Sequence, residues 1–302
     1  MSTEHEHSYE AVHSFYKGEF KKKYPNAFNT LELGGVHPDI SEPIENPYIE
    51  GEKDSGDYRN IGEHCVDVGI VAQKIASSLK ETGSIDEKTY LQIVERALIH
   101  DTNKRFEILR HEAQKAGQPI EVFSRSAYET MFAVLEKNGH SGPELEYIKT
   151  AGKETGHGSL VDFLTLNDQD EPVLHQDKTL SEMIVHLADD MVASPLKDRK
   201  TGGLLTKNSG TQFVSTAKRM DLGNFSSRYT FLYQEGIAFD QDGQAITVKN
   251  QQDADTKHLR GFNTYAYWQA KTSELICTKL KSLVDPDNGQ NPDEFIENVA
   301  NK

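Results

Sequence analysis

The stretch ALIHDTNK, residues 97–104, decides how this chain is interpreted. A run of apolar residues ends there in an adjacent histidine and aspartate, His100 and Asp101. Neighbouring side chains on a helix point about 100° apart, so the two can turn toward one point only where the helix ends. A neutral imidazole and a carboxylate are good ligands for a divalent metal. A helix-end cap with a hydrogen-bonded histidine is the alternative interpretation, and the pair taken alone favours it.

Apolar residues recurring at spacings of three and four predict amphipathic helices on both sides of this stretch. The helix before it is expected over residues 60–79, and a second helix begins at residue 90 and runs into His100. Four more helices are expected at residues 106–113, 122–135, 144–149 and 180–191.

The first of these helices carries a histidine at its apolar boundary. His64 lies on the side of the helix that also holds Ile61 and Val68. A core histidine hydrogen-bonded to a backbone carbonyl is one interpretation of His64, and a metal ligand is the other.

The helix over residues 180–191 carries two carboxylates, Asp189 and Asp190, among its apolar residues. Carboxylates on a core-facing helix cost free energy unless they are paired or bound to a metal. Three helices that each bring a ligand-type group to an apolar boundary favour a shared metal site. Which of the two aspartates would bind is left open by the pattern.

Three short elements in this order resemble the HD-domain superfamily of metal-dependent phosphohydrolases. RNIGEHCVDV, residues 59–68, resembles the helix of the first histidine in that superfamily, especially in its nucleotidase-like branch. ALIHDTNK resembles the His-Asp element, and IVHLAD, residues 184–189, resembles the last element. The resemblance covers about residues 59 to 194 and leaves the last hundred residues outside it.

The resemblance implies that His64, His100, Asp101 and Asp189 bind one divalent metal. It selects Asp189 over Asp190 because the aspartate of the family directly follows an alanine. Imidazoles and carboxylates suit Mn²⁺, Fe²⁺, Zn²⁺ or Ni²⁺, and Mg²⁺ is kept as a further choice, so the identity of the metal is left open.

Two more histidines lie between the His-Asp pair and the last aspartate. His140 and His157 are both flanked by glycines, which allow a loop to approach a site closely. His157 is expected in the pocket as a ligand or a proton donor, and His140 on a surface loop. The chain lacks the adjacent His-His pair that two-metal branches of the family tend to show, so one metal or two is left open.

Two cations are candidates for holding a phosphate. Lys104 follows Asp101 by three residues, nearly one helical turn, and a lysine there can hold a phosphate oxygen as a point charge. Arg59 precedes His64 by five residues and is expected over the mouth of the pocket. A plain solvated lysine is the alternative for Lys104.

The resemblance implies hydrolysis of a phosphate ester, expected to be of a nucleotide or similar small molecule, by metal-activated water. Asp101, Lys104, His157 and Arg59 are the expected catalytic residues. One alternative is an HD-like di-iron oxygenase, which needs six or so ligands, including both His140 and His157. The other is a non-catalytic nucleotide-binding module whose metal site is structural.

Composition narrows the expected partners and compartment. The net charge is 33 − 48 = −15, which disfavours broad nucleic-acid binding but allows a small anionic substrate in a locally positive pocket. Cys65 and Cys277 are too few for a disulfide framework and fit a reducing compartment. No run of about 18 apolar residues and no signal-peptide core is found, so a cytoplasmic protein without a membrane span is expected. The oligomeric state is left open.

The chain is expected to be mainly α, with a helical HD core and a C-terminal α+β extension. Residues 1–58 are expected to form an N-terminal extension with one helix over 9–20. For His5, His7 and His13, loose metal binding is one interpretation, and a flexible polar terminus is the preferred one. Residues 59–195 form the metal-binding helical domain, and residues 196–302 form the C-terminal subdomain packed on the core.

Within that C-terminal subdomain, Asp242-Gly243 between two short apolar runs predicts a β-hairpin over residues 237–248. A long helix is expected over residues 259–283, followed by a loop in DPDNGQNPDE, residues 285–294. The basic, glycine-rich residues 197–210 are expected to form a loop.

Overall fold

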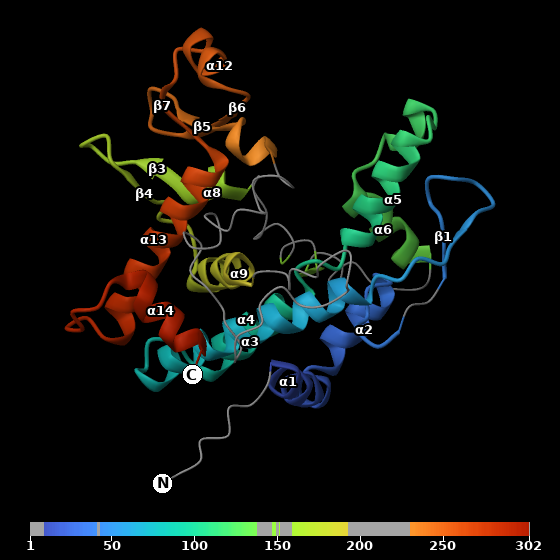
Figure 1. Ribbon diagram of the computed structural model, residues 1–302, viewed down its shortest axis with the longest axis horizontal. Coiled ribbons are helices and arrows are strands. Elements are labelled where there is room, and N and C mark those ends of the chain that lie inside the picture. The colour runs from blue at the N-terminus through green and yellow to red at the C-terminus, as the bar shows by residue number, and fades with distance from the viewer. Residues whose placement is uncertain are drawn as a thin grey trace. The chain divides into compact units, whose positions relative to one another are not determined.

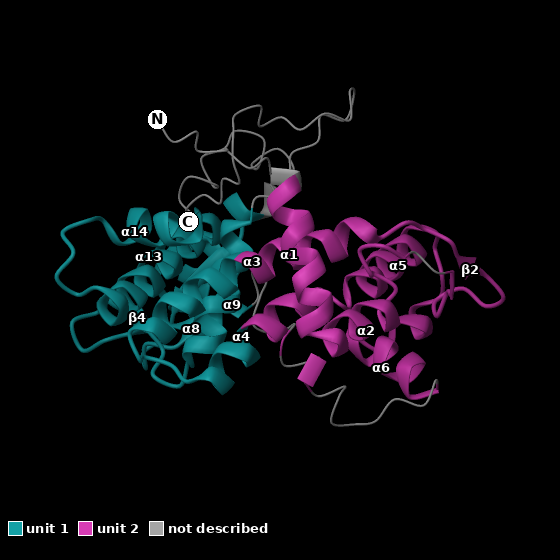
Figure 2. Cartoon of the chain, turned by 90° about the horizontal axis from the view of Figure 1, so that it is seen from below, with its two compact units in different colours: residues 1–8, 71–93, 155–302 teal, residues 9–70, 94–154 magenta. Residues whose placement is uncertain are grey.

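A computed structural model describes residues 9–40, 43–137, 147–148, 151, 159–192 and 230–301. The chain is mainly helical with small antiparallel sheets, as expected (Figure 1). It divides into two compact units, which are coloured separately in Figure 2. Unit 1 comprises residues 1–8, 71–93 and 155–302, and unit 2 comprises residues 9–70 and 94–154.

The predicted helices before and after the His-Asp pair are confirmed. Helix α3 (Arg59–Glu81) and helix α4 (Glu87–Ile99) each run from one unit into the other. Helix α5 (Lys104–Lys115) follows the pair. Unit 2 also contains α1 (Tyr9–Lys23), α2 (Pro25–Leu33), α6 (Ala127–Lys137), a 3-10 turn η1 (Ile120–Phe123) and the two-stranded pair β1 (Ile44–Glu45) and β2 (Lys53–Asp54).

The N-terminal segment is part of the core of unit 2. The predicted early helix is confirmed as α1, but α2 was not expected, although a proline at its first turn is a common helix start. Leu31 of α2 and Val36 pack with Ile61 and Cys65 of α3 in one buried cluster. Residues 9–58 therefore share a unit with the His-Asp pair, while the three predicted domain ranges stay a prediction.

Helix α6 begins later than predicted. The apolar pattern places its start at Val122, but that residue lies in η1. The Ser126 hydroxyl accepts from the Glu129 amide at 3.2 Å, and the Glu129 carboxylate accepts from the Ser126 amide at 2.7 Å. This reciprocal capping box starts the helix at Ala127. Of the helix expected over 144–149, the structure describes only residues 147 and 148.

Unit 1 contains the predicted helix over residues 180–191. It is confirmed as α9 (Leu180–Met191). A capping box fixes its start, because the Thr179 hydroxyl accepts from the Glu182 amide and the Glu182 carboxylate accepts from the Thr179 amide. A short helix α8 (Leu160–Phe163) and the hairpin of β3 (Leu164–Leu166) and β4 (Pro172–Leu174) precede α9.

The predicted β-hairpin over residues 237–248 is confirmed. Strands β5 (Gly236–Phe239) and β6 (Ala245–Val248) pair antiparallel, with Ile237 opposite Thr247. The turn carries Gly243 at a φ of +76°, a conformation that favours glycine. A 3-10 turn η3 (Thr230–Tyr233) precedes the hairpin, and α12 (Gln251–Thr256) follows it.

The long helix predicted over residues 259–283 is wrong at its start. Residues Arg260–Thr264 form strand β7, which pairs with β5 and completes a sheet in the order β6-β5-β7. Gly261 has a φ of +68°, outside the helical range, and the Thr264 hydroxyl accepts from the Tyr267 amide as an N-cap. Helix α13 (Tyr265–Val284) therefore begins only after the strand.

The loop predicted over residues 285–294 is also too long. Helix α14 (Pro292–Asn301) begins within it. The Asn291 side chain accepts from the Asp293 amide at 2.9 Å, and Pro292 occupies the first helical position. Among the described residues, no helix combines the length and apolar character needed to cross a membrane.

Candidate metal centre

Helix α4 ends at Ile99, and His100 and Asp101 occupy the turn that leads into α5. The Thr102 amide donates to the Ile99 carbonyl at 3.1 Å, and its hydroxyl donates to the same carbonyl at 2.6 Å. These bonds close the turn after the last helical residue. Adjacent side chains that would diverge within a helix can therefore lie on one side of it, as the sequence predicts.

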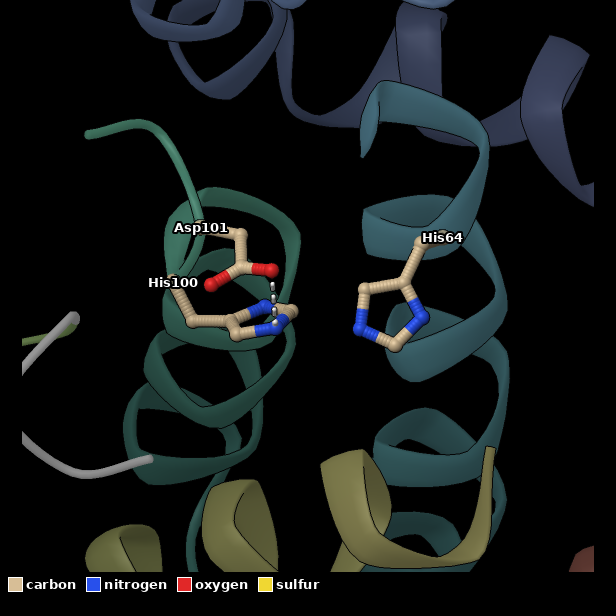
Figure 3. A group of neighbouring side chains, drawn as sticks. All are labelled: His64, His100 and Asp101. Carbon is tan, nitrogen blue, oxygen red and sulfur yellow. Dashed lines mark ion pairs between the residues drawn. The ribbon is translucent and has the colours of Figure 1, made fainter. Parts of the chain in front are cut away.

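His64, His100 and Asp101 come together as a group that could hold a metal ion (Figure 3). One ligand atom from each residue lies within 4.8 Å of the others. Figure 3 shows His64 on α3, facing the His-Asp turn. The two imidazole rings lie edge-on at 64°, with their centroids 5.3 Å apart.

The His100 ring is oriented for metal binding by the backbone. Its Nδ1 lies 2.8 Å from the Ala97 carbonyl oxygen, which can only accept, so Nδ1 carries the proton and donates. The Nε2 atom then presents its lone pair, 3.9 Å from Asp101 Oδ2. A histidine whose other nitrogen donates to a carbonyl is the usual arrangement in protein metal sites. The donor set and its orientation fit a divalent metal.

Burial differs among the three ligand groups. The His100 side chain is fully buried, whereas 24% of the Asp101 side chain is exposed. His64 is half-buried. The group thus combines a fully buried imidazole with a carboxylate that is partly exposed.

Cys65, next to His64, belongs to the core and is not among the three residues of the group. It is fully buried in the cluster with Leu31 and Val36. Burial raises the pKa of its thiol, so the thiolate that binds metals is disfavoured.

The two predicted phosphate-holding cations lie in the same unit as the group, and each is held by a carboxylate. Arg59 Nε donates to Asp57 Oδ1 at 2.9 Å on the exposed start of α3. These hydrogen bonds lower the pKa of Asp57 to about 2. Lys104 Nζ, on the first residue of α5, lies 3.0 Å from Glu107 Oε2.

The other predicted site residues are not among the three that converge. Asp189 is half-buried on α9, which belongs to unit 1. Its neighbour Asp190 is buried and accepts a hydrogen bond from the Gln269 side chain of α13. One oxygen of the Asp190 carboxyl is thus engaged within unit 1, and Asp189 as a metal ligand stays a prediction. His157 and His140 lie outside the described residues, as does the loop over 197–210.

Two residues near the group were not predicted from the sequence. Asn103 is buried at the start of α5, and its side chain donates to Glu107 Oε1 at 2.7 Å. Burial raises the pKa of the Tyr128 phenol on α6, and the charges of Glu107 and Asp101 raise it further. Tyr128 is therefore a neutral hydroxyl under the influence of the Asp101 carboxylate. Asn103 stands inside the ALIHDTNK element, while no local spacing marks Tyr128.

The prediction that His13 belongs to a flexible terminus is wrong. His13 lies in α1 and is 8% exposed. Its ring contacts acidic residues of α3, among them Glu63, which lies fifty positions further along the chain. His5 and His7 lie outside the described residues.

The chain matches no known family model, no curated protein and no solved structure. The case for a metal therefore depends on the convergence of His64, His100 and Asp101 and on the orientation of His100. Two imidazoles and one carboxylate, the ligand groups that converge among the described residues, form a donor set that suits a divalent metal.

Proposed function

We propose that this protein is a metal-dependent phosphohydrolase of the HD type that cleaves a phosphate ester of a nucleotide or a similar small molecule. The observation that carries the proposal is the convergence of His64, His100 and Asp101 at the turn after α4. The order of these residues along the chain, with Asp189 after them, adds the resemblance described above.

His64, His100 and Asp101 would hold a divalent metal, which would supply a water of lowered pKa and polarise a phosphoryl oxygen. His100 binds through Nε2, since its Nδ1 is committed to the Ala97 carbonyl. Asp101 has two oxygens and a partly exposed side chain, so it can bind with one oxygen and orient a water with the other. Asp189 is proposed as the fourth ligand and His157 as the proton donor.

The substrate side of the proposal rests on charge. The chain carries a net charge of −15, so an anionic substrate needs local cations. Lys104 follows the Asp101 turn directly, and Arg59 begins the helix that carries His64. Both pair with carboxylates at exposed positions, and a phosphate can compete for such cations because exposed ion pairs are weak.

One product assay tests the proposal. The protein is incubated with Mn²⁺ and a panel of nucleoside mono-, tri- and cyclic phosphates, and products are followed by chromatography. We expect turnover of at least one ester. We expect the Asp101→Asn variant to lose it by at least about a hundredfold, because removing a residue that acts directly in a catalytic site costs factors of this order.

His111→Gln is the matched control, since His111 is exposed on α5 in the same unit. It should hydrolyse the ester at the wild-type rate, whereas Asp189→Asn should be impaired. Full activity in Asp101→Asn would refute the proposal. No turnover with tightly bound iron would favour the oxygenase, and no turnover with tight nucleotide binding would favour the binding module.

A further inference from the structure

Helix α1 contacts the residue that directly precedes the metal-ligand candidate His64. His13 Nε2 lies 3.1 Å from Glu63 Oε2, 3.6 Å from Asp67 Oδ1 and 3.4 Å from the Glu63 carbonyl oxygen. Asp67 is 3% exposed, so the imidazole is set among acceptors of α3 with little water nearby. The contact therefore holds α3 through both the side chain and the backbone of Glu63.

Lys17, one turn further along α1, holds the same carboxylate from the other side. Its Nζ lies 2.9 Å from Glu63 Oε1 and 3.2 Å from Asp39 Oδ1. Partial burial alone would lower the pKa of Lys17, but the hydrogen bonds to Glu63 and Asp39 outweigh it and the pKa is raised. One Glu63 oxygen lies at ion-pair distance from His13 and the other accepts a hydrogen bond from Lys17, so two residues of α1 hold the Glu63 side chain between them.

The segment after α2 reaches both sides of the metal group. A Cβ on Gly34 would lie 2.5 Å from the Thr102 carbonyl oxygen, one residue beyond Asp101. A Cβ on Gly62, two residues before His64, would lie 2.2 Å from the Val36 carbonyl oxygen. Both contacts are so close that only glycine fits. The backbone around residues 34–36 thus packs directly on the α3 side and on the His-Asp side.

We propose that the N-terminal segment, residues 9–40, sets the spacing between His64 and the His100–Asp101 turn, with His13 as a positioning residue for His64. The inference rests on the proposed metal centre. A metal site needs its ligands held within about half an ångström, by neighbours that are themselves locked in place. His13 and Lys17 lock the rotation of α3 at Glu63, and the glycine contacts lock the distance across the group.

Titration of the full-length protein with Co²⁺ tests the inference, because the visible absorption of Co²⁺ reports both affinity and ligand geometry. We expect His13→Leu to weaken Co²⁺ binding by about tenfold or more and to change its absorption bands, as loss of supporting contacts does in other metal sites. His13→Gln should restore both, since its amide nitrogen can take the place of Nε2 and donate to Glu63.

A matched pair on the same helix provides the control. Lys17→Met should weaken Co²⁺ binding, whereas Lys22→Met should not, because Lys22 pairs with the exposed Glu19 of its own helix. Thermal unfolding of each metal-free variant separates positioning from stability, and Lys17→Met serves if His13→Leu does not fold. Wild-type affinity and spectrum in both His13→Leu and Lys17→Met would overturn the inference.

The outcomes also separate this inference from the proposed function. Co²⁺ binding by the wild type without hydrolysis of any ester would refute the phosphohydrolase and leave the positioning role intact. Hydrolysis that depends on Asp101 but is unchanged in the His13 and Lys17 variants would support the phosphohydrolase and overturn the positioning role. A wild-type protein that binds no Co²⁺ would overturn both.

Discussion

Each unit of this protein contains a buried histidine close to a carboxyl group. In unit 2, His100 Nε2 lies 3.9 Å from Asp101 Oδ2, and in unit 1, His186 Nε2 lies 3.7 Å from Asp190 Oδ2. The separations are almost equal, yet only the first pair belongs to a group that could hold a metal among the described residues.

The surroundings of the two pairs explain the difference. The Asp190 side chain is 3% exposed and accepts a hydrogen bond from Gln269, while the His186 ring packs on Phe163 with centroids 4.6 Å apart. The unit 1 pair is thus buried, with Gln269 on its carboxyl and Phe163 on its imidazole. In unit 2 a second imidazole faces the pair, and part of the carboxylate is exposed.

The difference also has a backbone origin. His186 and Asp190 lie four residues apart within α9, so their side chains share one helix face and meet each other. His100 and Asp101 are adjacent at the end of α4, where both can face a ligand from another helix. A histidine and an aspartate become a metal candidate through the third group they meet, and not through their proximity to each other.

The largest expected effect is a loss of Co²⁺ affinity when His100 is replaced, and the same replacement of His186 should not cause it. His100→Gln should lower Co²⁺ affinity by at least about a hundredfold, because it removes the oriented Nε2 donor and the imidazole that suits this metal. His186→Gln should leave Co²⁺ affinity within about twofold, because Asp190 is engaged by Gln269. Isothermal titration calorimetry measures both.

The comparison fails if the two variants lose Co²⁺ affinity equally. Such a result would mean that His186, and not only the group in unit 2, contributes to metal binding. Unfolding of both variants without metal should be measured alongside, since each removes a buried side chain.

A smaller effect, on the free energy of unfolding, is expected from removing the hydrogen bond that Asp190 of the unit 1 pair accepts. Gln269→Leu removes the donor to the buried Asp190 carboxyl and should lower the free energy of unfolding by about 2 kcal/mol, because a buried acceptor loses its hydrogen bond. Urea unfolding followed by circular dichroism gives the value.

Gln252→Leu, at an exposed position of α12 in the same unit, should change the unfolding free energy by less than about 0.5 kcal/mol. Equal effects of the two substitutions would show that the Gln269–Asp190 bond does not stabilise unit 1.

Most of the helices could be predicted because their signals are local. The apolar stripe of α3, the capping box of α9 and the Asp-Gly turn of the β5–β6 hairpin lie within a few residues of the elements they form. Strand β7 could not be predicted in this way. Its residues read as the start of a helix, and pairing with β5 overrides that local preference.

The candidate site shows the same limit. His64, His100 and Asp101 could be selected because each lies where an apolar helix pattern meets a ligand-type residue. His13 could not, because its partner Glu63 is fifty residues away and nothing near His13 marks it as buried. A residue that only positions a ligand lies in no sequence pattern typical of a site, so His13 is recognised from the contacts between α1 and α3.

The smallest expected effect concerns the alkaline stability of unit 2. Partial burial, together with the charge of Asp54, raises the pKa of the Tyr58 phenol to about 12. An unfolded tyrosine ionises at about pH 10, so between pH 10 and 12 the unfolded chain releases a proton that the folded chain keeps. The contribution of the neutral Tyr58 phenol to the free energy of unfolding is therefore fully present below pH 10 and is lost as the pH rises toward 12.

Tyr58→Phe should remove this pH dependence and keep the ring that lies 4.7 Å from the Arg105 guanidinium. The fall in the urea midpoint between pH 9 and pH 11 should be smaller in Tyr58→Phe than in the wild type. Part of the fall should persist, since burial also raises the pKa of Tyr128. Tyr267→Phe replaces a side chain that is 46% exposed in unit 1, and its urea midpoint should fall by as much as that of the wild type. Identical falls in Tyr58→Phe and the wild type would show that the phenol of Tyr58 titrates alike in the folded and unfolded chain.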